Sequence, residues 1–199
     1  MKQLHRKDLF GWSEFDKQRN LDFHSILWVR DEGNVLIDPL PMSEHDHDHL
    51  QHLGGVNHII VTNSDHCRAT EQIVSSTGAL VYAPADEEER FPIFCDHWIH
   101  DKEEVFAGLI AYQLHGSKTA GELALLLDNH TLITGDLIRC HVAGELCLLP
   151  DAKLSNKHLA VKSVKRLAEL PNITAILTGD GWPIFSHGSE ALHRLARSL

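Results

Sequence analysis

Acidic, basic and imidazole side chains gather in a few short segments of this 199-residue chain. Each segment follows an apolar run, a pattern typical of loops at the ends of strands. Because ligands bind beyond the carboxyl ends of strands in open α/β sheets, we expect these segments to meet in one site. The segments are residues 38–39, 62–68, 115–121, 135–136 and 179–181.

Histidine is unusually abundant, with 16 copies against 18 lysines and arginines together. So many imidazoles raise the hypothesis of a metal site. The densest run contains His45, His47, His49 and His52. His45 and His49 are four residues apart and could hold a metal on one face of a helix. We favour the alternative of a solvated helix, since strings that look like motifs often arise by chance.

Length and charge limit the class of protein. A chain of 22.4 kDa with 43% hydrophobic residues is typical of one globular domain, which we place at residues 1–199. The net charge of −10 argues against nucleic acid as a partner. We find no signal peptide and no apolar run that could span a membrane, so we expect a cytoplasmic protein with no membrane partner. The sequence does not determine the oligomeric state.

The apolar patterns predict an α/β chain. Strands are predicted at residues 23–29, 35–37, 58–62, 79–82, 109–114, 122–127, 131–134 and 173–178. Helices are predicted at residues 44–53, 66–77, 156–170 and 187–199. This order provides helices to cover a pair of sheets on both sides.

Five of these segments, in this order, resemble the metallo-β-lactamase superfamily. VLIDPL resembles the family's early strand that ends in Asp, and HIIVT resembles the strand before the motif T-H-x-H-x-D-H. GSKTAG resembles the turn G-H-T-P-G, TLITGDLI the strand that ends in Gly-Asp, and ILTGDG the late strand that ends in Gly-His-Gly. The resemblance runs from Phe23 to Pro183 and implies a four-layer αβ/βα sandwich in a short form.

The chain departs from this family at the metal ligands. The family's mechanism uses one or two metal ions, usually zinc or iron, to generate hydroxide near neutral pH. Cys67 takes the place of the motif's Asp, and only Asp136 keeps the residue that the family has as a ligand. The five ligand histidines are replaced by Asn63, Asp65, Arg68, Lys118 and Asp180.

Carboxylates that converge in a cleft without a metal need other positive charges. Arg68 and Lys118 stand at former ligand positions and cannot ligate a metal while protonated. We therefore predict that these two cations pair with Asp65, Asp136 and Asp180. An internal ion-pair cluster would then replace the metal, and no cofactor is expected.

Two residues of the second segment have alternative roles. His66 could form a hydrogen-bonded pair with Asp65, or it could begin the helix that follows. Cys67 could be a nucleophile activated by Arg68 and a helix N-terminus, but we favour an inert thiol because the spacing shows no histidine partner. His115 could point into the cleft or simply end its strand.

Two classes of function are consistent with these residues. We favour a hydrolase-like protein without family-type catalysis, whose cleft binds a small ligand of unknown identity. The alternative is an active hydrolase of an ester, thioester or phosphodiester. Its acid–base residues would be Asp65, His66 and Asp136. If it used a divalent metal (Mn, Mg, Fe or Zn), the oxygen-rich ligand set would be Asp65, Asp136, Asp180 and Asn63.

Overall fold

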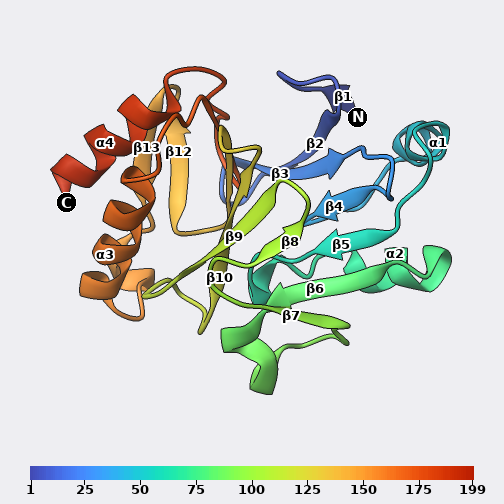
Figure 1. The fold of residues 1–199 in the computed structure, drawn as a ribbon, viewed down its shortest axis with the longest axis horizontal. Coiled ribbons are helices and arrows are strands. Elements are labelled where there is room, and N and C mark those ends of the chain that lie inside the picture. The colour runs from blue at the N-terminus through green and yellow to red at the C-terminus, as the bar shows by residue number, and fades with distance from the viewer.

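Two β-sheets stacked face to face form the centre of the molecule, and helices cover both outer faces (Figure 1). The computed structural model describes residues 1–199. The larger sheet has seven strands in chain order: β1 (Lys2–Gln3), β2 (Leu9–Asp16), β3 (Leu21–Trp28), β4 (Val35–Ile37), β5 (His58–Ile60), β6 (Leu80–Pro84) and β7 (His97–Ile99). The smaller sheet has the order β14 (Ala175–Thr178), β11 (Thr131–Thr134), β10 (Glu122–Leu127), β9 (Leu109–Leu114) and β8 (Glu104–Phe106).

The remaining elements surround this pair of sheets. Strands β12 (Ile138–Val142) and β13 (Glu145–Leu148) form a separate hairpin. The helices are α1 (Glu44–His52), α2 (Thr70–Thr77), α3 (Lys157–Ala168) and α4 (Gly188–Ser198). Three short 3₁₀ turns are η1 (Ser64–His66), η2 (Ala85–Arg90) and η3 (Asp151–Lys153).

Side-chain alternation along β10 shows how the layers pack. Leu123, Leu125 and Leu127 face the larger sheet and join the core between the two sheets. Ala124 and Leu126 face the other way, into the core beneath α3 and α4. Successive residues of a strand point to opposite faces, so a strand with both faces covered is apolar throughout.

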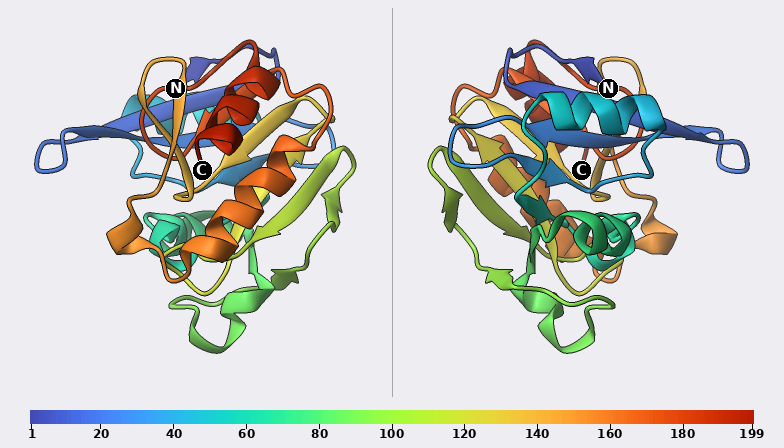
Figure 2. Two further views of the ribbon diagram at one scale, coloured as in Figure 1. Left: turned by 90° about the vertical axis from the view of Figure 1, so that its left-hand side faces the viewer. Right: turned by 90° about the vertical axis from the view of Figure 1, so that its right-hand side faces the viewer.

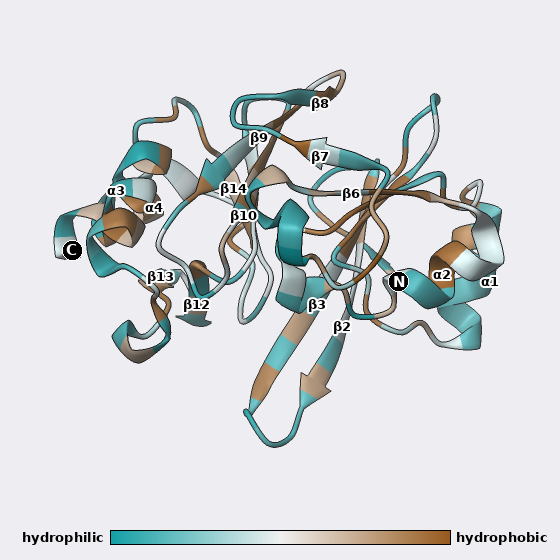
Figure 3. Cartoon of the chain, turned by 90° about the horizontal axis from the view of Figure 1, so that it is seen from below, coloured by the Kyte–Doolittle hydropathy of each residue, from teal (hydrophilic) through white to brown (hydrophobic).

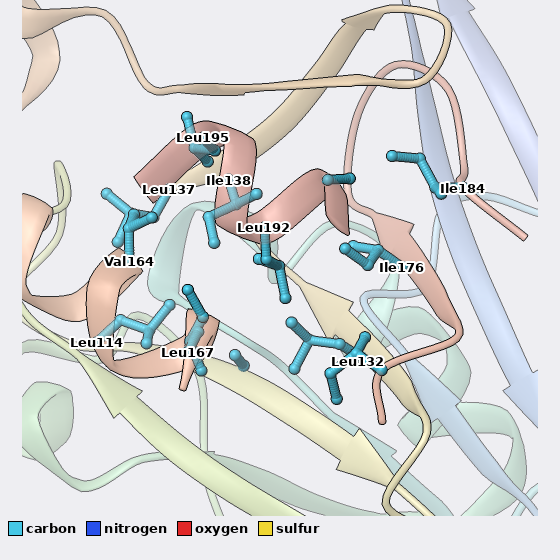
Figure 4. Close-up of a cluster of buried hydrophobic side chains, with 14 of the residues drawn as sticks. Leu114, Leu132, Leu137, Ile138, Val164, Leu167, Ile176, Ile184, Leu192 and Leu195 are labelled. Atoms are coloured by element: carbon cyan, nitrogen blue, oxygen red, sulfur yellow. The ribbon is translucent and has the colours of Figure 1, made fainter. Parts of the chain in front are cut away.

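Each outer face is closed by two helices. Helices α3 and α4 contribute Val164, Leu167 and Leu192 to the core on the smaller sheet (Figure 4). Helices α1 and α2 contribute Leu50 and Ile73 to the core on the larger sheet. In Figure 2 the two helix pairs lie on opposite sides of the molecule. These layers confirm the expected four-layer αβ/βα sandwich.

The largest differences from expectation are one helix start and the strands β1, β2, β7, β8, β12 and β13, which were not predicted. The helix expected at residues 66–77 begins only at Thr70, because Arg68 has a positive φ of 42°, which interrupts a right-handed helix. Of the hairpins β2–β3 and β12–β13, only β3 was predicted. Strands β2 and β13 are only partly buried, so their apolar patterns are weak. The β2–β3 hairpin projects from the body of the molecule (Figure 3). No helix combines the length and apolarity needed to cross a membrane.

The core between the sheets gives a first stability test. Leu125 is fully buried there, whereas Leu80 is 44% exposed. We expect Leu125→Ala to lower the free energy of unfolding by about 2–5 kcal/mol, since it removes buried methyl groups and leaves a cavity. Leu80→Ala is the matched control and should change stability by about 0.5 kcal/mol or less. Urea unfolding measures both, and equal losses would contradict this packing.

Candidate functional site

Loops from both sheets meet at one end of the sandwich. Asp38 follows β4 and η1 follows β5, and these two strands run parallel, so their loops leave the same sheet edge. Asp136 follows β11 and Asp180 follows β14, a second parallel pair in the smaller sheet. The backbone N–H of Leu123 donates to the carbonyl of Thr62 at 2.8 Å and ties the two edges together.

Gly135 permits this close approach. A Cβ atom at position 135 would lie 2.8 Å from Thr62 Oγ1 and 3.0 Å from Asn63 Nδ2. Real side chains do not tolerate such distances, so the loop after β11 comes this near to the loop after β5 only with glycine. The contact brings Asp136 against η1.

A row of alternating positive and negative side chains lies where the loops of the two sheets meet. His66 Nδ1 lies 2.8 Å from Asp38 Oδ2, and His66 Nε2 lies 3.4 Å from Asp136 Oδ2. Lys118 Nζ lies 2.9 Å from Asp136 Oδ2 and 2.8 Å from Asp65 Oδ2. The Asp136 carboxylate therefore lies between an imidazole and an ammonium group. Asp65, with 53% of its side chain exposed, is the last residue of this row of charges and faces solvent.

His66 is held as an imidazolium. Burial alone would lower its pKa, but the Asp38 carboxylate, with Asp136 on the other side, raises the pKa of His66 to about 9. Asp38 is itself fixed, because Thr62 donates to it through the backbone N–H at 2.7 Å and the hydroxyl at 2.6 Å. His66 pairs with Asp38 and Asp136 and not with Asp65, so of the two roles considered for His66 the pair with Asp65 does not form.

Asp136 and Lys118 stabilise each other's charged forms. Burial acts to raise the pKa of Asp136, but His66 and Lys118 hold that pKa well below its usual range. Burial acts to lower the pKa of Lys118, and the Asp136 and Asp65 carboxylates raise it. Both groups are therefore ionised at neutral pH.

Asp180 pairs with Arg139, and not with Arg68 or Lys118 as we had expected. Arg139, on β12, donates to both oxygens of Asp180: its Nε lies 2.8 Å from Oδ1 and 2.6 Å from Oδ2, and its Nη2 also contacts Oδ2. Both residues are buried. The only sequence signal was an arginine inside the otherwise apolar run LIRC.

Arg68 does not pair with the three aspartates, which corrects our expectation. Its Nη1 donates to the backbone carbonyls of His24 and Asp38, at 2.7 and 2.8 Å. Its guanidinium also lies over the ring of Phe23, 5.7 Å from the centroid. The left-handed backbone at Arg68 turns the side chain toward these strands, so Arg68 joins β3 to the loop after β4.

Asn63 and Cys67 have structural surroundings. Asn63 is buried and its Oδ1 accepts the backbone N–H of Asp65 at 3.0 Å. Burial, followed by the charge of Asp38, raises the pKa of Cys67 to about 12, so the thiol stays protonated. A protonated thiol is a poor nucleophile and a poor metal ligand.

Glu122 is a site residue that sequence reasoning missed. It is fully buried, and its oxygens accept the Ser117 hydroxyl at 2.5 Å and the Leu137 N–H at 2.8 Å. Burial and the nearby charge of Asp136 raise the pKa of Glu122 to about 7. A glutamate that opens the buried strand ELALLL was the available signal.

The histidine-rich run and His115 contribute little to this site. His49 packs against the ring of Phe10, and His52 Nδ1 contacts the backbone oxygen of Asp48 at 2.6 Å. Their helix, α1, covers the outer face of the larger sheet. His115 is half exposed, with Nδ1 3.4 Å from Asp86.

A family model described as the metallo-β-lactamase superfamily matches residues 1–199. The chain belongs to the metallo-β-lactamase superfamily. A search of the curated proteins found no match.

Solved structures share the fold at low sequence identity. A metallo-β-lactamase from Pontibacter korlensis has a TM-score of 0.75 and 17% identity, over 98% of this chain and 97% of that chain. TTHA1623 in a di-iron-bound form has a TM-score of 0.71 and 22% identity, over 94% and 100%. FIM-1 from Pseudomonas aeruginosa, in a mono-zinc form, has a TM-score of 0.72 and 14% identity, over 100% and 95%.

The residues present here do not fit the metal centre of such relatives. The ammonium of Lys118 lies between Asp65 and Asp136, and a guanidinium engages both oxygens of Asp180. Ammonium and guanidinium groups offer donors only, with no lone pair for a metal. Four cations, His66, Arg68, Lys118 and Arg139, accompany four carboxylates, Asp38, Asp65, Asp136 and Asp180.

The charge on His66 makes stability depend on pH. Its folded pKa of about 9 lies above the ordinary value of 6.5, so its contribution is fully present below about pH 6.5 and is lost as the pH rises to about 9. We expect NMR titration of the ring to give a pKa near 9. Unfolding free energy should fall over the same range, and His66→Gln should flatten that fall. A ring that titrates near 6.5 would contradict the ion-pair chain.

Lys118 can be tested against a matched exposed lysine. We expect Lys118→Met to lower unfolding free energy by about 1–3 kcal/mol, because it leaves the buried carboxylate of Asp136 short of a partner. Lys157 contacts Asp151 at 2.6 Å, but both side chains are more than half exposed. Lys157→Met should therefore cost about 0–1 kcal/mol in chemical denaturation. Equal effects would show that Lys118 is an ordinary surface cation.

Proposed function

We propose that this chain is a metallo-β-lactamase-fold protein in which protein cations replace the metal centre, and that its cleft binds a small polar molecule without metal-dependent hydrolysis. One observation carries the first part: Lys118 Nζ lies 2.8 and 2.9 Å from the carboxylates of Asp65 and Asp136. An ammonium group in this position occupies the oxygens that a metal would use.

The state of His66 supports the loss of family-type catalysis. A general base needs a free lone pair near the operating pH. Both ring nitrogens of His66 face carboxylates, and its pKa of about 9 keeps both protonated at neutral pH. Asp136 lies between the cations His66 and Lys118. The arrangement of Asp65, His66 and Asp136 therefore favours ion pairing over proton transfer.

Cations already engage the three aspartates of the alternative, oxygen-rich metal site. Asp65 and Asp136 share Lys118, and Asp180 is engaged by Arg139 on both oxygens. A divalent ion would have to displace two cations, each from buried or half-buried carboxylates. Removing one partner of a fully buried pair, such as Arg139 and Asp180, costs about 3–5 kcal/mol.

A cavity of about 640 Å³ beside Lys118 supports the ligand-binding part. This volume is ordinary for small-molecule sites. Its lining is polar. The cations are Lys118 and Arg90, the carboxylates are Asp86, Glu87, Glu88 and Glu89 of η2, and the other lining residues are Ser64, Ala85, Thr119 and Ala120. We therefore propose a ligand rich in hydrogen-bonding groups, and amines are favoured over anions by the excess of carboxylates.

Elemental analysis together with turnover tests the proposal. Protein purified without a metal-affinity step should contain far less than one equivalent of zinc, iron or manganese. It should show no turnover of ester, thioester or phosphodiester substrates when Mn²⁺ or Mg²⁺ is added. Stoichiometric metal would contradict the replacement of the metal centre. Turnover that Asp136→Ala abolishes, and that Lys157→Met preserves, would establish the hydrolase instead.

A further inference from the structure

A second cavity lies between the N-terminal strands and the end of β14 with the loop that follows it. Its volume is about 450 Å³. Its walls come from β2 and β3 on one side and from Leu177, Thr178 and Pro183 on the other. These segments are joined where His24 N–H donates to the carbonyl of Gly179 and Gly181 N–H donates to that of Asp22, both at 3.0 Å. Figure 2 shows the N-terminal strands beside this segment.

The cavity walls carry both apolar and polar residues. The apolar ones include Leu4, Trp12, Ile26, Leu177 and Pro183. The polar ones include Lys2 and Asp46, and Asp46 pairs with the N-terminal ammonium of Met1, which also lines the cavity. Gly11, in the middle of β2, also lines it and presents no side chain. A Cβ atom at position 11 would lie 3.3 Å from Leu4 Cδ2, so glycine here leaves room for Leu4 to pack against β2.

His24 supplies a directed polar group. Its Nε2 contacts the carbonyl oxygen of Gly181, and because a carbonyl only accepts, Nε2 carries the hydrogen. In the neutral ring Nδ1 is then the acceptor, and no hydrogen bond within the chain engages it. The backbone oxygen of His24 accepts from Arg68 Nη1 at 2.7 Å.

We infer that this cavity binds a small molecule with an alkyl or aromatic body and a hydroxyl or amide N–H head that donates to His24. The volume falls in the range of small-molecule sites, and such sites combine apolar walls with a few fixed polar groups. The site is lined by the N-terminal strands, Asp46, the end of β14 and Pro183, and none of these residues pairs in the ion-pair cleft, so this inference is independent of the proposed function.

Methyl NMR with two matched probes tests the inference. The probes are 1-octanol and octyl methyl ether, which have the same alkyl chain but differ in the hydroxyl donor. We expect saturable shifts of the Ile26 and Leu177 methyl groups, with octanol bound about three- to tenfold more tightly than the ether. His24→Phe should remove this preference while keeping the binding of both probes.

Variants of two leucines separate this site from general surface binding. Leu4→Trp places a larger side chain in the cavity and should weaken octanol binding by more than about tenfold. Leu80→Trp is the control, because Leu80 is exposed on β6 and does not line the cavity. Circular dichroism checks that both variants are folded. Shifts without saturation, shifts at Leu80 or Leu159 instead, or equal binding by both variants would overturn the inference.

Discussion

The carboxylate of Asp136 lies between two cations, the imidazolium of His66 and the ammonium of Lys118, and the organisation of the cleft depends on this arrangement. Asp136 is 5% exposed, and a buried carboxylate with no counter-charge would be costly. Each cation is in turn matched by a second carboxylate, Asp38 or Asp65. The result is a run of paired opposite charges at the end of the sandwich where the loops of the two sheets meet.

The sandwich brings these charges together by backbone geometry. Parallel pairs in each sheet send the loops after β4, β5, β11 and β14 to the same end of the molecule. Gly135 then lets the two edges approach, and Arg68 ties the carbonyls of His24 and Asp38. The scaffold fixes where these loops meet, whereas function resides in the side chains that the loops present.

Much of the fold and part of the site follow from sequence. The buried strands around HIIVT and ELALLL are apolar on both faces, and the motif order placed the loops that contain Asp65, Lys118 and Asp136. The partner of Asp180 could not be predicted, because Arg139 lies on a hairpin with a weak pattern and an irregular register. The role of Arg68 depends on a positive φ that residue type does not reveal. His66 lies at a variable position of the family motif, so only the structure shows its two carboxylate partners.

Anomalous X-ray scattering at the zinc edge, from crystals grown with excess zinc, tests the central claim most directly. We expect no anomalous peak between Asp65 and Asp136, and light-atom density there that is continuous with the side chain of Lys118. A zinc peak about 2.0–2.2 Å from an oxygen of Asp136, with Lys118 displaced, would contradict the replacement of the metal by protein cations.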